Sequence, residues 1–166
     1  MDSNKSVTAT FFDVILESGI RLNSVVPIDP TDIKDTSGRP DIFLYPLIEM
    51  TVEVAGAGDT GVVRVVFPSP VPADYNWYKY TNGDSWILFD RNSLSDGAGD
   101  GAEFNADRTQ ITVYITDNGS YDDDPANGII FDPSGLGKKT VFSPIPPFSG
   151  SSSGGGGGCF IAVVSE

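Results

Sequence analysis

The amino-acid sequence predicts an all-β fold, an antiparallel two-sheet β-sandwich. Its 166 residues include 19 Gly and 12 Pro, and these turn formers separate short extended segments at intervals of roughly 10 to 20 residues. None of the segments has the helical period of an amphipathic helix of useful length. One sheet must bury its apolar face against another, so two packed sheets are the simplest arrangement.

The first half of the chain predicts three extended segments. Residues 6–16 (SVTATFFDVIL) alternate and then run apolar, as a first strand would. Residues 27–40 lack any period and are rich in Pro and Asp, which predicts a long loop. Pro46 interrupts the next extended segment, residues 42–54, and so predicts an edge position, a bulge or two separate strands. In residues 62–67 (VVRVVF), Val63, Val65 and Phe67 would share one face while Arg64 points to the other.

Residues 75–80 (YNWYKY) and 85–89 (SWILF) predict a β-hairpin, because the link between them contains Asn-Gly, the strongest short hairpin signal. Aromatic residues in such a hairpin usually form cross-strand pairs that cover a core. Exposed on one face, the same rings would instead stack on a sugar. Both interpretations stay open for three residues: Trp77, Tyr78 and Trp86.

Two further strands are expected in the second half. Residues 110–116 (QITVYIT) alternate cleanly, so the isoleucines and the valine would face the core. Residues 127–131 (NGIIF) predict a last short strand. The sequence Asp-Pro-Ser-Gly at residues 132–135 would end that strand in a turn.

The C-terminal part of the chain differs in kind from the rest. Residues 149–158 (SGSSSGGGGG) have the composition of a flexible linker, so we expect the sandwich domain to span residues 1–148. Residues 159–166 begin with an apolar, β-prone peptide that needs a partner in water. That partner is either its own domain, onto which it would fold as a final strand, or another molecule. The residues concerned are Cys159, Phe160, Ile161, Ala162, Val163 and Val164.

The charge of the chain argues against several classes of partner. Its 23 Asp and Glu residues outnumber its 10 Lys and Arg residues, which gives a net charge of −13. A surface this negative repels phosphate groups, so we expect neither nucleic acid nor a membrane surface as a partner. Divalent cations suit it better, and solubility alone is the other explanation. No stretch approaches the ~20 apolar residues of a membrane-spanning helix.

The densest group of potential oxygen ligands lies in residues 116–128. Ca²⁺ takes about 6 to 8 oxygen ligands from carboxylates, amides and backbone carbonyls, and such a loop can supply them. Its spacing differs from that of an EF-hand, in which Asp positions alternate and a Glu closes the loop. A solvated turn is the alternative. The candidate ligands for Ca²⁺ are Asp117, Asn118, Asp122, Asp123, Asp124 and Asn127.

We do not expect an enzyme. The chain has no His, which is the commonest general base and metal ligand. Its single Cys excludes an intramolecular disulfide, and a serine or cysteine nucleophile would lack a histidine base. A glycosidase needs paired carboxyl groups across a cleft, and none of the few Glu residues lies in a recognisable signature.

Six stretches carry a resemblance to a known family: residues 63–73 (VRVVFPSPVPA), 77–80 (WYKY), 109–113 (TQITV), 116–119 (TDNG), 122–124 (DDD) and 127–135 (NGIIFDPSG). They lie within roughly residues 50–137 and resemble the choice-of-anchor U domain of bacterial surface proteins. Residues 154–162 (GGGGGCFIA) also resemble the tail found after such domains. The resemblance implies a secreted, surface-attached domain next to a sorting tail, and it implies no catalytic residues.

Together these features predict a non-enzymatic extracellular structural module that assembles with copies of itself as a surface layer or filament. Cys159 would be modified by a lipid or another group, or would pair with Cys159 of another chain. Alternatively, residues 160–164 would add as a strand to a neighbour's sheet edge. Burial of Cys159 as a small apolar residue is a third option. The alternative function is a carbohydrate-binding or adhesin module, attached by cell-envelope anchoring machinery. Residues 1–5 have no apolar signal region, so we expect an export signal to have been removed.

Overall fold

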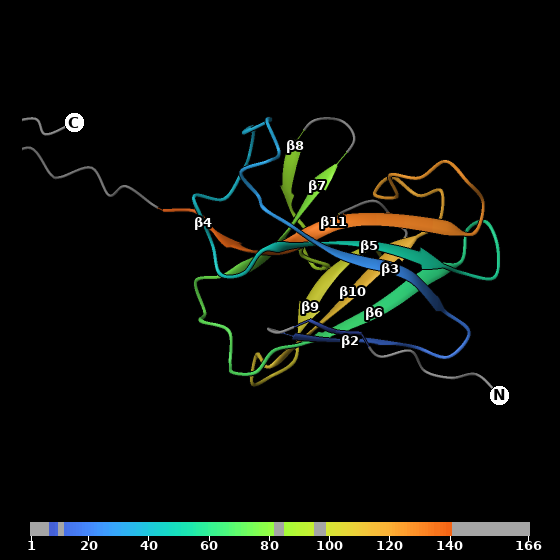
Figure 1. Cartoon of the computed structure of the whole chain (residues 1–166), viewed down its shortest axis with the longest axis horizontal. Coiled ribbons are helices and arrows are strands. Elements are labelled where there is room, and N and C mark those ends of the chain that lie inside the picture. Colours follow the sequence, from blue (N-terminus) through green and yellow to red (C-terminus); the bar gives the residue numbers. More distant parts are fainter. Residues whose placement is uncertain (1–6, 10–11, 82–84, 95–98, 141–166) are drawn as a thin grey trace, which may run out of the picture.

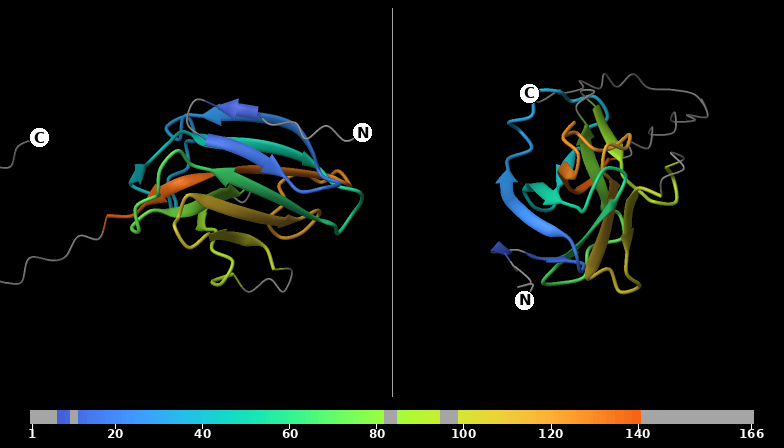
Figure 2. Two further views of the ribbon diagram at one scale, coloured as in Figure 1. Left: turned by 90° about the horizontal axis from the view of Figure 1, so that it is seen from below. Right: turned by 90° about the vertical axis from the view of Figure 1, so that its right-hand side faces the viewer.

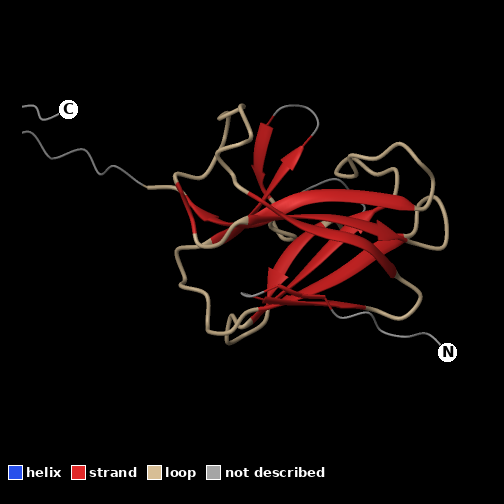
Figure 3. Ribbon diagram, in the orientation of Figure 1, coloured by secondary structure: helices blue, strands red, loops and turns tan. Residues whose placement is uncertain are grey.

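The computed structural model describes residues 7–9, 12–81, 85–94 and 99–140. Figure 1 shows these residues as two layers of strands, and Figure 2 shows the layers from two further sides. Every regular element in the described part of the chain is a β-strand (Figure 3), so none of it is a helix long and apolar enough to cross a membrane. The predicted all-β sandwich is confirmed.

The first sheet is antiparallel and has the strand order β1-β2-β6-β10-β9. The region predicted as one first strand forms two strands, which pair with each other as a hairpin. The two central strands, β6 and β10, pair from Gln110 to Thr116. The bounds are β1 (Val7–Ala9), β2 (Phe12–Leu16), β6 (Thr60–Val66), β9 (Gly101–Phe104) and β10 (Gln110–Thr116).

The second sheet has the strand order β3-β5-β11-β7-β8. A short strand, β4, pairs with the C-terminal end of β11. Pro46 separates β4 from β5, which was one of the three arrangements predicted for it. Strands β7 and β8 pair antiparallel, which confirms the predicted hairpin. The bounds are β3 (Arg21–Ile28), β4 (Ile42–Phe43), β5 (Leu47–Glu53), β7 (Asn76–Thr81), β8 (Ser85–Leu88) and β11 (Ile129–Lys138).

Strand β11 contradicts one prediction from the sequence. Residues 132–135 do not turn but continue the strand between its neighbours β5 and β7. Glycine at position 135 permits a close approach, because a Cβ atom there would lie 2.9 Å from Cδ2 of Leu47. Gly135 therefore serves tight packing in the middle of the sheet, and residues 132–135 do not reverse the chain.

Strands β3 and β9 were also not predicted. β3 runs into the segment that was expected to be a loop, and Pro27 lies near its end. It is an edge strand of its sheet in the described part of the chain, a position in which proline is tolerated. β9 has only four residues, and it pairs antiparallel with residues 111–114 of β10.

The core between the sheets follows the alternation of the strands. Ile111, Val113 and Ile115 on β10 are at most 3% exposed, as predicted. Val63 and Val65 on β6 are buried beside them. A second, smaller cluster of Leu47, Tyr78 and Trp86 lies on the outer face of the second sheet, because neighbouring strand residues point to opposite faces.

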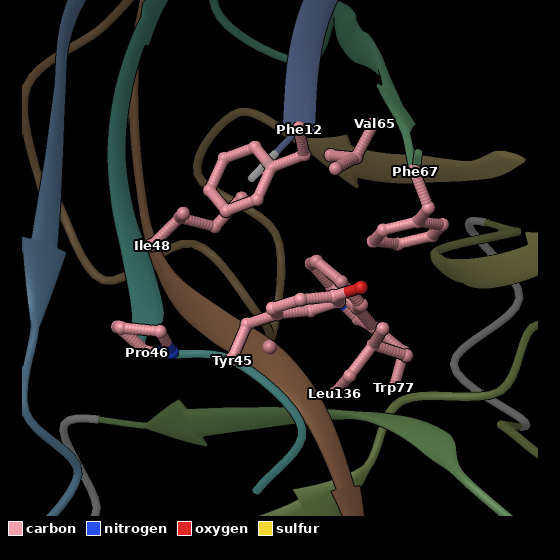
Figure 4. Close-up of a pocket in the computed structure, with 9 residues that line it drawn as sticks. Phe12, Tyr45, Pro46, Ile48, Val65, Phe67, Trp77 and Leu136 are labelled. Carbon is pink, nitrogen blue, oxygen red and sulfur yellow. The ribbon is translucent and has the colours of Figure 1, made fainter. Parts of the chain in front are cut away.

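Two small apolar cavities lie between the sheets. Figure 4 shows the first, surrounded by Phe12, Ile48, Val65 and Trp77 among other residues. Each cavity has a volume of about 10 Å³, which is room for roughly one water molecule. Neither cavity could hold a sugar or a peptide.

Candidate functional site

The acidic loop, residues 117–128, connects β10 to β11 and turns its carboxylates onto its own backbone. Asp117 is buried, and its Oδ1 accepts a hydrogen bond from the backbone N–H of Gly128 at 2.9 Å. Its Oδ2 accepts one from Nδ2 of Asn118 at 2.7 Å. The same Nδ2 donates to Oδ1 of Asn127 at 3.0 Å, so these side chains close the base of the loop.

Asp122 organises the other side of the acidic loop. Its Oδ1 accepts hydrogen bonds from the backbone N–H groups of Asp124 and Phe131, each at 3.1 Å. Its Oδ2 accepts one from the N–H of Asn118 at 2.9 Å. Asp124 in turn accepts from the N–H of Ala126 at 2.8 Å. The carboxylates thus take the place of backbone partners in a loop without regular structure.

The structure brings the six candidate calcium ligands into one loop but turns them toward different partners. Among the described residues, no group of three or more His, Cys, Asp or Glu side chains is arranged to hold a metal ion. Calcium binding by the loop stays a prediction from the sequence.

Lys79 on β7 is the largest fully buried side chain of the described residues. Trp77 lies two positions before it on the same strand and packs in the core between the sheets. Strand alternation therefore places Lys79 on the inward face as well. A lysine in this position is unusual, because lysine is almost never fully buried unless it is paired.

The partners of Lys79 are two carboxyl groups. Its Nζ lies 2.9 Å from Oδ1 of Asp132 on β11 and 3.1 Å from Oδ2 of Asp123 in the acidic loop. It also donates to the backbone carbonyl of Phe131 at 3.3 Å. Ser134 donates its hydroxyl to Oδ2 of Asp132 at 2.6 Å. We call Lys79, Asp123, Asp132 and Ser134 the buried lysine cluster.

The buried lysine cluster joins three parts of the chain: β7, β11 and the acidic loop. Lys79 and Asp132 have 0% of their side-chain surface exposed, and Asp123 has 7%. Asp123 was predicted as a calcium ligand, whereas the structure pairs it with an ammonium group. Sequence reasoning missed Lys79, Asp132 and Ser134. The signal for Lys79 was its spacing of two residues from Trp77, which puts both on one face.

The three residues considered for sugar stacking are buried. Trp77, Tyr78 and Trp86 are 4%, 7% and 4% exposed, so none presents a ring face to a sugar. Trp86 donates Nε1 to the carbonyl of Asp35 at 3.0 Å and contacts Phe43, with ring centres 5.4 Å apart. Burial raises the pKa of the Tyr78 phenol above its ordinary value. Packing accounts for all three rings: Trp77 lies in the core between the sheets, and Tyr78 and Trp86 lie in the smaller cluster on the outer face of the second sheet.

The predicted assembly segment lies outside the described residues. Cys159, Phe160, Ile161, Ala162, Val163 and Val164 belong to it, as does the linker at residues 149–158 before it. The division of the chain at residue 148 is likewise a prediction from the sequence.

Comparisons with known proteins give no relative from which to transfer a function: no protein-family model, no curated protein and no solved structure matches this chain. The resemblance to the choice-of-anchor U domain stays a prediction from the sequence.

Proposed function

We propose that the chain is a non-enzymatic, extracellular structural module that assembles with copies of itself through residues 159–166. The observation that supports a structural role is the orientation of the charged side chains. Carboxylates of the acidic loop hold backbone N–H groups and the buried Lys79. A catalytic or ligand site would instead aim such groups into a cleft.

The small volume of the two interior cavities, about 10 Å³ each, supports the same proposal. The extracellular location rests on the resemblance and on the acidic composition. Both are properties of the sequence, and secretion of the natural protein would test them directly.

Assembly is supported by the C-terminal segment and by the edge of the second sheet. The apolar residues follow a linker of ten residues, which spans at most about 33 to 36 Å when fully extended. In the described part of the chain, β3 pairs with β5 alone, and its Val26 is 45% exposed. An edge strand presents backbone groups that a donated strand can extend.

The experiment compares the full chain with a version ending at Phe148, by light scattering and negative-stain microscopy over a range of concentrations. The full chain should form oligomers or filaments, and the shortened chain should stay monomeric. A full-length Ile161→Asp, Val163→Asp variant keeps the linker and the length, and it should also stay monomeric. Cys159→Ser separates disulfide pairing from strand addition.

Two results would contradict the proposal. If both chains stay monomeric at every concentration, residues 159–166 do not drive assembly. If both assemble equally, the contact lies in the sandwich and the C-terminal segment has another role.

A further inference from the structure

We propose that Lys79 and Asp132 become joined by an intramolecular amide bond, an isopeptide bond that links β7 to β11 inside the sandwich. Three features of the described residues support this bond. The two side chains are fully buried, they are in contact, and a third carboxyl group touches the nitrogen that reacts.

The two strands hold the reacting groups within reach of each other. Lys79 lies opposite Ser134 in the register of β7 and β11, so Asp132 lies two residues along on the same inward face. Nζ of Lys79 is 2.9 Å from Oδ1 of Asp132. Because neighbouring strands fix both side chains, most of the entropy cost of bringing the groups together is met by folding.

The ion pair already contains the atoms of an amide and one water molecule. An ammonium group and a carboxylate hold three N–H protons and two oxygens between them. The amide keeps one proton and one oxygen, and the remaining atoms leave as water. No oxidant, reductant or other reactant is needed.

Burial favours the amide over the ion pair. Both charged groups lose their hydration in the interior, and that loss is costly even for a paired lysine and aspartate. The amide is neutral, and the water that it releases returns to bulk solvent. The same condensation is unfavourable between free groups in water, where both ions are well hydrated.

The remaining members of the buried lysine cluster are placed to assist the reaction. A proton first moves from Nζ to the carboxylate of Asp132, which leaves a neutral amine and a neutral acid. The nitrogen lone pair then attacks Cγ of Asp132. Oδ2 of Asp123, 3.1 Å from Nζ, accepts the proton that the attacking nitrogen loses.

Asp123 then returns this proton to Oδ1 of Asp132, the Cγ–Oδ1 bond breaks, and water leaves. Meanwhile the hydroxyl of Ser134, 2.6 Å from Oδ2 of Asp132, stabilises the negative charge that develops on this oxygen. In the product, the amide N–H donates to Asp123 and the amide oxygen accepts from Ser134. Both polar atoms of the new bond therefore keep a buried partner.

The first experiment measures the mass of the full chain, folded and purified without denaturant. The bond predicts a mass lower than that of the sequence by one water molecule. Mass alone is insufficient, because the Asp-Gly sequences at residues 96–97 and 100–101 also lose water when they form a cyclic imide.

Digestion with trypsin locates the loss. An acylated Lys79 is not cleaved, so residues 65–91 should remain in one piece and be joined to residues 109–138, which contain Asp132. Lys79→Met should restore the full mass and release the two peptides separately.

Lys138 provides a matched control. Its Nζ also lies 2.9 Å from an aspartate oxygen, that of Asp74, but the side chains are 26% and 61% exposed. In the unaltered chain no peptide should join Lys138 to Asp74, and the Lys138→Met variant should keep the mass deficit. Asp123→Asn keeps Lys79 and Asp132 in place, and it should slow the loss of water in folded protein at least tenfold.

A folded full chain with the mass of its sequence, cleaved normally after Lys79, would overturn the proposal. A deficit that maps to an Asp-Gly sequence would overturn it equally. In either case the buried lysine cluster is an ionic contact only. Since the measurement uses the unaltered chain, it does not depend on whether the variants fold.

Discussion

Nζ of Lys79 lies 2.9 Å from Oδ1 of Asp132 in the interior, and the same distance separates Nζ of Lys138 from Oδ2 of Asp74 at the surface. The two pairs have the same chemistry and differ in exposure. At the surface, water and salt replace a lost partner. In the interior, removal of one partner leaves a charge without compensation.

The first prediction follows from this contrast. Lys79→Met should lower the free energy of unfolding by about 3 to 5 kcal/mol, because it leaves the buried carboxyl groups of Asp123 and Asp132 without Lys79, whether Lys79 is an ammonium group or part of the amide. Lys138→Met should have a much smaller effect. Urea unfolding followed by tryptophan fluorescence measures both, since Trp77 and Trp86 are buried in the folded protein.

A double variant provides the control for this prediction. Lys79→Met combined with Asp132→Leu also removes the buried carboxyl group that Lys79→Met leaves without a partner, so it should recover part of the stability lost in Lys79→Met. Equal losses for Lys79→Met and Lys138→Met would contradict the prediction.

The second prediction concerns Arg108, which holds the loop after β6. Its guanidinium donates to the backbone carbonyls of Val71 at 3.0 Å, Pro72 at 3.2 Å and Tyr75 at 2.5 Å. It also lies 3.8 Å from the ring centre of Phe104. Arg108→Lys keeps the charge but loses the planar guanidinium group that donates to these carbonyls. We therefore expect the free energy of unfolding to fall by about 2 kcal/mol.

Arg21→Lys is the matched control for Arg108→Lys. Arg21 has 75% of its side chain exposed and lies 3.5 Å from Glu53, so the same change there should leave the unfolding midpoint nearly unchanged. In the Arg108→Lys variant, hydrogen exchange should be faster at the backbone N–H of Val71, which donates to the carbonyl of Arg108. Unchanged exchange in Arg108→Lys would exclude this anchoring role.

Part of the fold could be predicted from the sequence because it depends on local pattern. Residues 110–116 alternate strictly, and the period of two fixes which of their side chains are buried. The β7–β8 hairpin was predicted equally well, because its Asn-Gly link is a local signal.

The buried lysine cluster could not be predicted because its causes are not local. Asp132 and Ser134 lie in a run of turn formers, and only the pairing of β11 with both β5 and β7 makes that run a central strand. Lysine and aspartate are expected at the surface, and the position of the acidic loop over β7 reverses this expectation.

The third prediction tests calcium binding by the acidic loop. If the loop binds Ca²⁺, the free energy of unfolding should rise by about 2.7 kcal/mol when free calcium exceeds its dissociation constant a hundredfold. Asp124→Asn, which keeps an oxygen for the N–H of Ala126, should weaken this effect without unfolding the loop. A thermal melt with calcium or with a chelator measures the difference.

An identical unfolding midpoint with calcium and with chelator would contradict calcium binding. Magnesium at the same concentration is the control for ionic strength and general screening, because it prefers a smaller, octahedral site. A rise with both ions alike would indicate screening of the charge of −13 rather than a specific site.

The fourth prediction concerns stability in acid. Thr140 donates its backbone N–H and its hydroxyl to Oδ2 of Asp41, at 2.6 and 2.9 Å. These hydrogen bonds, the backbone one first, lower the pKa of Asp41 below its ordinary value. Thr31 lowers the pKa of Asp29 in the same way. Each carboxyl group therefore binds its proton less tightly in the folded chain than in the unfolded chain.

The sign of the effect follows from this difference. The stabilisation is complete above about pH 4, the ordinary value for aspartate, and it is lost as the pH falls further through the lowered pKa of the folded state. Asp41→Asn should therefore destabilise the protein at about pH 7 and have little effect at about pH 2, so that its stability falls less steeply in acid. Urea unfolding across this range measures the slope. If Asp41→Asn lowers the free energy of unfolding equally at both pH values, Asp41 acts through packing rather than through its charge.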